Sequence, residues 1–472
     1  MAPRSPLIRC WAPLDQGVGS GGDFAQGDLP TKGSDIVVGP PPDLFRKRTS
    51  APGATALWAP AHYSALVLTH PTPSSTGPNA AQKRAILLLS LATFSSMAVQ
   101  RMCDAMLPDL SRVFDAPMAL VGHVISFYAV THGLMQLIYG PVGDRWGKYR
   151  VVMLTTLGCS VGAMLSAWSQ DLDQLVMARI ITALSSAAIV PLALAWVGDQ
   201  VPYAQRQETL ARLGLGTMLG ITAGQWMGGL ITDTWGWRWA FVGMSVLFAG
   251  VAVLLWREEK QVAAGTLPVS GKAGFVQQTA EVFRTTWARK VLLIALLEGA
   301  TIFGMLTITA AHLHHTHGLS LTWAGGTSAL FGLGGMLFMG TAKPTIARLG
   351  EVNMARVGGG LLVVSFGVIA FSPWWTLAIP ACFFTGYGFA MFHNTLQAKA
   401  TQMAPQARGT AVTLFASGLF LGQSVGVSAV TQFVDRWGSA QVMALADACL
   451  VAVVLFFAHQ LKLRNATDLD RL

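Results

Sequence analysis

Several charged residues lie inside long apolar stretches of the sequence, among them Arg101, Asp104, Arg179 and Glu298. If these stretches are membrane helices, each charge costs roughly 2.5–3.5 kcal/mol to insert, so it needs an ionic partner or a water-filled cavity. Arg101 and Asp104 are three residues apart, which places them on one face of a helix. The chemistry available to such groups is the binding of protons or of a charged solute.

Two interpretations of these carboxylates stay open. Asp104 either forms a local ion pair near the end of its helix, since Pro108 follows soon, or faces a cavity as a protonatable group. Glu298 has no basic neighbour at helical spacing, which favours binding of a proton or a cationic solute. Alternatively, Glu298 pairs across helices with Arg179 or Arg101. A pair that breaks on protonation would satisfy both interpretations.

Uncharged polar residues in the same stretches are weaker candidates, because an interhelical hydrogen bond explains most of them. The adjacent His393 and Asn394 favour contact with a solute, and Gln136 and Gln397 are further candidates for lining a cavity. The histidines between 312 and 317 have no carboxylate or cysteine beside them. We therefore predict neither a metal site nor a cofactor.

The elements that must position these groups are membrane helices. Hydrophobic residues make up 52% of the 472 residues and charged residues 12%, whereas soluble domains carry about a quarter charged residues. Twelve apolar stretches approach the roughly 20 residues that a membrane helix requires. We predict an all-α membrane protein whose twelve spans form two parallel six-helix bundles.

The spans divide the chain into five segments. They are a low-complexity arm (1–82), a first six-helix bundle (83–256), a linker without an obvious fold (257–290), a second bundle (291–462) and a tail (463–472). Twelve of the 22 prolines lie in the arm, which is typical of disorder, and a later start of translation is an alternative explanation for it.

Lysine and arginine alternate between the two sides of the predicted spans. The side that holds the N-terminus carries 21 of them and the opposite side three. Basic residues concentrate on cytoplasmic loops, so both termini should be cytoplasmic. The scatter of basic residues also argues against nucleic acid as a partner, although the net charge is +9.

The fifth and eleventh spans repeat each other at a constant separation of 202 residues. The repeat matches Gly216, Gly220 and Gly224 with Gly418, Gly422 and Gly426, Asp233, Trp235 and Gly236 with Asp435, Trp437 and Gly438, and Arg206 with Arg408. Glycines spaced every four residues form a flat helix face for close packing. Parallel repeats of this kind are typical of transporters with a solute site between the halves.

The loop after the second span resembles a signature of the major facilitator superfamily, G-x-x-x-D-R-x-G-[RK]. The matching residues are Gly140, Asp144, Arg145 and Gly147, and the resemblance implies that they latch one conformational state by pairing with the other half. The second half keeps only Arg348 and Gly350. Arg179 resembles an arginine that the family associates with proton coupling.

The fifth span resembles the family's antiporter motif, with Ile221 and Gln225 as departures from it, and 386–426 is similar to bacterial drug and sugar efflux permeases. The resemblance implies a monomeric exporter of a small solute, a drug-like compound or a sugar, which it exchanges for protons across the cytoplasmic (inner) membrane. Uptake by symport or uniport is one alternative, and a membrane sensor that transports nothing is another. No enzyme motif is visible, so catalysis is not expected.

Overall fold

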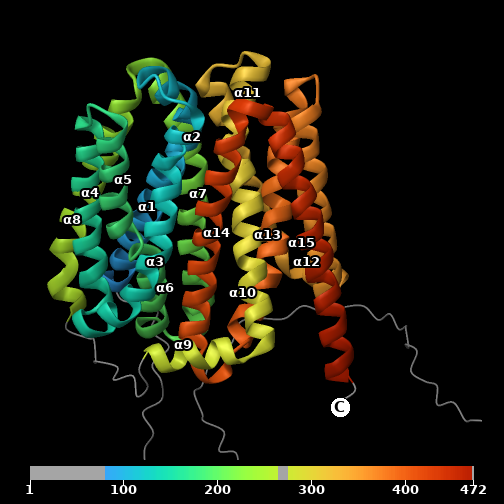
Figure 1. Ribbon diagram of the computed structural model, residues 1–472. Coiled ribbons are helices and arrows are strands. Elements are labelled where there is room, and N and C mark those ends of the chain that lie inside the picture. The colour runs from blue at the N-terminus through green and yellow to red at the C-terminus, as the bar shows by residue number, and fades with distance from the viewer. Residues whose placement is uncertain (1–79, 264–274, 470–472) are drawn as a thin grey trace, which may run out of the picture. The chain divides into compact units, whose positions relative to one another are not determined.

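The computed structural model describes residues 80–263 and 275–469, and all regular elements in these ranges are helices (Figure 1). The prediction of an all-α protein is confirmed. Most of the predicted arm lies outside the described residues, but its last residues, 80–82, already belong to the first helix. The chain divides into Met1–Thr72 and Pro73–Leu472, and the description below concerns the second unit.

Two sets of helices correspond to the two predicted bundles. The N-half comprises α1 (Ala80–Val113), α2 (Met118–Val121), α3 (His123–Trp146), α4 (Lys148–Trp168), α5 (Leu172–Ser186), α6 (Ile189–Gln200), α7 (Tyr203–Trp235) and α8 (Trp237–Ala263). The C-half comprises α10 (Thr286–Glu298), the π-helix η1 (Gly299–Phe303), α11 (Gly304–His317), α12 (Leu321–Phe371), η2 (Trp375–Leu377), α13 (Ala378–Gln402), η3 (Pro405–Ala407), α14 (Arg408–Trp437) and α15 (Ser439–Leu469).

Ten helical stretches within the described ranges are long and apolar enough to cross a membrane. Two further spans bring this number to the predicted twelve. The 51-residue α12 contains two helical segments that meet at Gly350, where the backbone leaves helical geometry. The 33-residue α7 is long enough to span, but its charged first turns and its glycines make it less apolar.

Glycines in left-handed conformation make the tightest connections. Gly147 (φ 88°) and Gly350 (φ 67°) turn the chain at equivalent points of the two halves, and Gly236 (φ 92°) and Gly438 (φ 82°) do so again. A side chain is strained in this region of φ, so glycine is the residue that fits. The shared glycines explain why these parts of the repeat are visible in the sequence.

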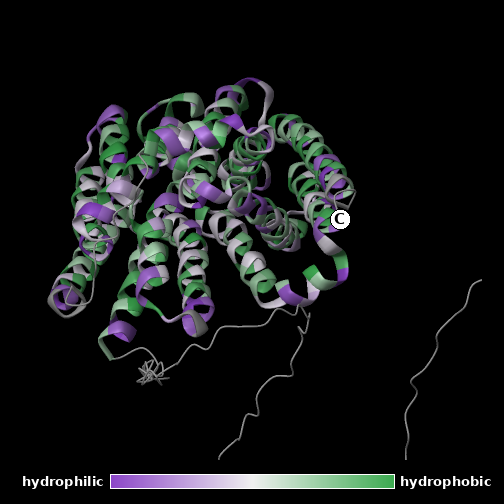
Figure 2. Cartoon of the chain, turned by 90° about the horizontal axis from the view of Figure 1, so that it is seen from below, coloured by the Kyte–Doolittle hydropathy of each residue, from purple (hydrophilic) through white to green (hydrophobic). Residues whose placement is uncertain are grey.

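Apolar side chains cover the outside of the helices as well as their core. Leu157, Val246, Val364 and Leu455 are each at least half exposed. Seen along the helix axes, the ribbons are largely green and white, with shorter hydrophilic stretches (Figure 2). A water-soluble protein would not expose so many large apolar residues, so this surface faces lipid.

Glycine faces join α7 to α1 and α14 to α10 and η1. A Cβ atom at Gly220 would lie 2.3 Å from the carbonyl oxygen of Phe94, and one at Gly426 would lie 1.9 Å from that of Ala300. The structure places Gly216, Gly224 and Gly422 in similar contacts, while Gly418 is looser, at 3.7 Å from Leu292 O. Each half thus brings two backbones together through the same part of the repeat.

The predicted linker is more ordered than expected. Within 257–290, α8 continues to Ala263 and a separate helix, α9 (Phe275–Arg284), lies across one end of the bundle (Figure 1). Its apolar residues fall at helical spacing, with Val282 fully buried, and Gln278 accepts a hydrogen bond from Thr410 at 2.5 Å. We call the side of the bundle that carries α9 the α9 end, and the opposite side the distal end.

Candidate functional site

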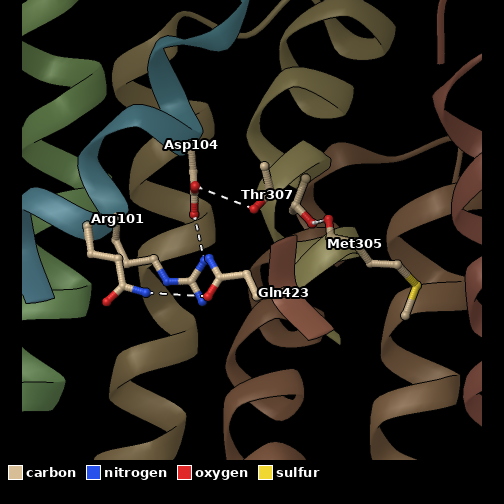
Figure 3. A network of polar contacts seen from close by, with 7 residues as sticks. Arg101, Asp104, Met305, Thr307 and Gln423 are labelled. Carbon is tan, nitrogen blue, oxygen red and sulfur yellow. Dashed lines mark hydrogen bonds and ion pairs between the residues drawn. The ribbon is translucent and has the colours of Figure 1, made fainter. Parts of the chain in front are cut away.

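The centre of the site is the ion pair that the spacing of Arg101 and Asp104 predicts as one alternative. Arg101 Nη1 donates to Asp104 Oδ2 at 3.1 Å, and both side chains are at least 98% buried. The other carboxylate oxygen, Oδ1, accepts from Thr307 Oγ1 at 3.5 Å. Since α1 belongs to the N-half and α11 to the C-half, Asp104 contacts both halves (Figure 3).

Two more contacts cross between the halves beside this pair. The guanidinium carbon of Arg101 lies 4.3 Å from the centre of the Phe303 ring, a cation–π contact. On the same helix, Gln100 donates to Gln423 Oε1 on α14 at 3.4 Å (Figure 3). A charged group and an amide of α1 are therefore both held by the C-half.

Several amide atoms in this region are buried without satisfying their hydrogen-bonding capacity. Gln100 Oε1 and Gln423 Nε2 have no partner, and neither does the amide nitrogen or the amide oxygen of Gln225. Buried polar atoms are nearly always paired, so each of these calls for a water molecule, a solute or a change of conformation.

A second pair, with a buried carboxylate and a half-buried histidine, lies within the C-half. Glu298, at the end of α10, has both carboxylate oxygens 3.2 Å from Nδ1 of His393 on α13. The His393 ring stacks on Phe389 at 5.0 Å and lies near Phe415 at 5.5 Å. Glu298 therefore pairs with the histidine, and the alternative pairing with Arg179 or Arg101 is wrong.

Arg179 is buried in the N-half and binds backbone rather than a carboxylate. It donates to Val99 O at 2.9 Å and to Val124 O at 3.4 Å, and its guanidinium carbon lies 4.2 Å from the centre of the Tyr128 ring. The side chain thus joins α5 to α1 and α3. One nitrogen, Nη2, has no partner.

Next to Arg179, a short chain of polar groups leads to the boundary between the halves. The hydroxyl of Tyr128 lies 2.5 Å from Ser186 Oγ, which lies 3.1 Å from His132 Nδ1. The His132 ring is 4.3 Å from that of Phe420 on α14. In the sequence His132 is a lone histidine, which gives no sign of these neighbours.

The remaining cavity candidates are less closely connected. Gln136 is buried one turn after His132, and its Oε1 has no partner. Asn394 is half-buried and Gln397 is exposed, so the structure groups neither of them with the pair formed by Glu298 and His393. Thr307 and Phe303 were missed, because a threonine and a phenylalanine are ordinary residues of an apolar helix.

The loop signature lies at the α9 end. Gly147 makes the one-residue turn between α3 and α4. Asp144 is exposed and binds Lys148 at 2.9 Å, and Lys148 also binds Asp199 at 2.6 Å, so these ion pairs stay within the N-half. Arg145 is exposed as well. Asp144 therefore does not make the pairing with the other half that the resemblance implies. A Cβ atom at Gly140 would meet nothing within 4 Å.

Comparisons with known proteins agree with this geometry. The sequence pattern that defines the Major Facilitator Superfamily matches residues 89–427. The chain is 22% identical over 385 residues to an uncharacterized MFS-type transporter, YwfA of Bacillus subtilis (strain 168), an alignment that covers 79% of this chain and 92% of that protein. It is 23% identical to a protein of Pasteurella multocida (strain Pm70) described as a probable sugar efflux transporter, over 80% and 92% of the two chains.

The fold also matches solved structures. A crystal structure of the nucleoside transporter NupG superimposes with a TM-score of 0.64 at 14% identity, covering 80% of this chain and 99% of that one. The predicted arrangement of membrane helices in two bundles is confirmed by this similarity.

Proposed function

Because the chain belongs to the major facilitator superfamily and is a multi-pass membrane transporter, we propose that it exports a small solute in exchange for protons. The observation that carries this proposal is Asp104, a buried carboxylate that binds a cation of its own half through one oxygen and Thr307 of the other half through the second.

The arrangement links protonation to the contact between the halves. A proton on Asp104 removes the negative charge that attracts Arg101, and Arg101 in turn rests on Phe303 of the C-half. A ligand shifts a conformational equilibrium only through different affinities for the two states, and a proton is such a ligand here. We propose that Glu298 and His393 are a second proton-binding pair, and that Arg179 stabilises the N-half around the site.

The solute is proposed to be an uncharged polar molecule, such as a sugar, more readily than a cationic drug. The carboxylates are already paired with Arg101 and His393, whereas the amides of Gln100, Gln225 and Gln423 offer unused donors and acceptors. A solute with several hydroxyl groups would satisfy them. Gln136, Asn394 and Gln397 are proposed as further contacts.

The proposal includes the orientation. The α9 end would face the cytoplasm, so that both termini are cytoplasmic in an inner membrane, and the protein would act as a monomer. The loop of Gly140, Asp144, Arg145 and Gly147 would then lie at the cytoplasmic face and latch a state other than the one observed. Uptake by symport would use the same site and the same proton gradient, with the solute moving in the direction of the protons, and a uniporter would use no proton gradient.

Proton coupling is tested in liposomes that contain the purified protein and a pH-sensitive dye. A panel of sugars, cationic drugs and amino-acid-like solutes is added, and the Glu298→Gln and Asp104→Asn variants are measured beside the wild type. Asp447→Asn serves as the matched control, because Asp447 lies on α15, which packs on α12 and α14 of its own half.

We expect solute-evoked proton movement in the wild type and in the control, and its loss in at least one of the other variants. The direction of the proton movement relative to the solute flux distinguishes antiport from symport. Solute flux without proton movement would rule out coupling, and the absence of both flux and binding across the panel would favour the sensor.

A further inference from the structure

Two carboxylates at the distal end reach from one half to the other. Asp435, in the last turn of α14, accepts a hydrogen bond from the backbone N–H of Met118 at 2.8 Å. Asp233, near the end of α7, accepts from Thr322 N at 2.6 Å and from Leu321 N at 3.3 Å, and from the Thr322 hydroxyl at 2.7 Å. The two aspartates are 202 residues apart, the separation of the internal repeat.

Each aspartate binds the beginning of a helical span that belongs to the opposite half. Met118 starts the span Met118–Trp146 of the N-half, and Leu321 starts α12 of the C-half. The first N–H groups of a helix have no partner within it, and they form the positive end of its dipole, so a carboxylate is favourable there. The charge and the hydrogen bonds therefore act in the same direction.

The span that Asp435 binds has no side-chain cap of its own. The residue before it is Pro117, whose side chain makes no capping hydrogen bond. Asp435 of the other half therefore supplies the acceptor that a serine or aspartate usually provides at this position. At α12, Ser320 caps Trp323 N, and Asp233 takes the two N–H groups before it.

The two halves pack closely one turn before each aspartate. A Cβ atom at Gly229 would lie 2.1 Å from Leu321 O, and one at Gly122 would lie 2.4 Å from Thr431 Oγ1. Gly229 and Thr431 precede Asp233 and Asp435 by four residues. Each capping contact is thus seated in a closely packed junction between the halves.

We propose that Asp233 and Asp435 form a two-part clasp that holds the distal end closed, and that both contacts break when the solute pathway opens there. The clasp follows from the repeat, because each half contributes one carboxylate and one helix start. The inference rests on the alternation of the halves, and it depends neither on the identity of the solute nor on proton coupling.

A third aspartate at the distal end provides the matched control. Asp171 accepts from Gln174 N at 2.8 Å and caps α5, but both residues belong to the N-half. Removing this carboxylate eliminates a cap of the same chemistry without touching the boundary between the halves.

The test measures distances between spin labels in the purified protein by double electron–electron resonance, without solute or proton gradient. One pair of labels replaces Gln170 and Thr376 at the distal end, and a second pair replaces Gln207 and Gln402 at the α9 end; all four residues are exposed. Cys10 and Cys449 are changed to serine so that the labels attach only at these positions. The variants are Asp233→Ala, Asp435→Ala, the double variant and Asp171→Ala.

We expect each single clasp variant to raise the ratio of distal-open to distal-closed molecules about two- to tenfold, the range that corresponds to one charge at a helix start. The double variant should multiply the two effects, and the labels at the α9 end should approach each other. Asp171→Ala should leave both distributions unchanged.

Asp233→Asn and Asp435→Asn keep an acceptor of the same shape and should give smaller shifts, which also tests the idea if an alanine variant does not fold. The clasp is refuted if the double variant has the wild-type distal distances, if Asp171→Ala shifts them equally, or if the wild type is already distal-open. Because no transport is measured, such a result is independent of the proposed export and proton coupling.

Discussion

Glu298 on α10 and His393 on α13 contact each other within the C-half, with both oxygens of the carboxylate 3.2 Å from Nδ1 of the histidine. Glu298 is fully buried, and the His393 ring contacts the rings of Phe389 and Phe415. The ring is therefore held beside the carboxylate by packing as well as by the hydrogen bond. Because the pair lies within one half, its effect on the other half must pass through the helices.

Removing the histidine should leave a buried carboxylate without its partner. We expect His393→Phe to destabilise the protein by about 3 kcal/mol, as is typical when one member of a buried pair is removed. Adding Glu298→Gln to this variant should recover much of the loss. The measurement is the thermal unfolding of the four proteins in one detergent, and purely additive losses would show that the two groups do not interact.

Removing one member of the ion pair of Arg101 and Asp104 should also destabilise the protein. It should reduce transport more than removal of His393 does. Asp104→Leu leaves Arg101 charged and buried, so we expect a loss of about 3–5 kcal/mol in stability. The exposed pair of Glu208 and Arg212 is the control: Glu208→Gln should change stability by less than about 1 kcal/mol. Equal losses in the two variants would mean that burial is not what makes the central pair important.

The sequence predicts the parts of this protein whose signals are patterns along the chain. Apolar stretches gave the helices, the separation of 202 residues gave the parallel halves, and the spacing of Arg101 and Asp104 gave one of their two interpretations, the ion pair. It did not predict that α9 forms in the linker. This helix is short, and its few apolar residues were not enough to identify it.

The sequence did not predict which residues of different helices contact each other. Nothing near Glu298 points to His393, which is 95 residues away, and Thr307 becomes a contact of Asp104 only when the halves meet. Asp233 and Asp435 were found as members of the repeat, but their role at opposite helix starts depends on how the halves are placed. Contacts between distant segments are set by packing, which a single sequence does not display.

The glycine face of α7 offers a prediction about packing. We expect Gly220→Ala to destabilise the protein by about 1–3 kcal/mol, because its Cβ atom would press against the Phe94 carbonyl and separate α7 from α1. Gly250→Ala on α8 is the matched control, since a Cβ atom there meets nothing within 4 Å. Thermal unfolding should show a lower midpoint for the first variant only, and an unchanged midpoint for Gly220→Ala would mean that the helices can move apart at no cost.

Removing the unpaired amide of Gln225 should stabilise the observed conformation, whereas the preceding substitutions should destabilise it. Gln225→Met keeps the length of the side chain and removes two buried atoms that lack partners, so we expect the observed conformation to gain about 1–3 kcal/mol. The same change should weaken solute binding, which can be measured by isothermal titration calorimetry once a solute is known. A variant that is both less stable and equally active would show that the amide is satisfied in the native protein.

One membrane span carries both Glu298 and Thr307, the contact of Asp104, and the π-helix η1 lies between these two residues. Glu298 precedes Gly299–Phe303, and Thr307 follows it. A π-helical turn accommodates one residue more than an α-helical turn, and each residue of an α-helix turns the chain by about 100°. This single extra residue sets the rotational phase between the two sites. A chain that lacked it would keep Glu298 against His393 but would turn Thr307 away from Asp104, so the span would hold one site without connecting it to the other half.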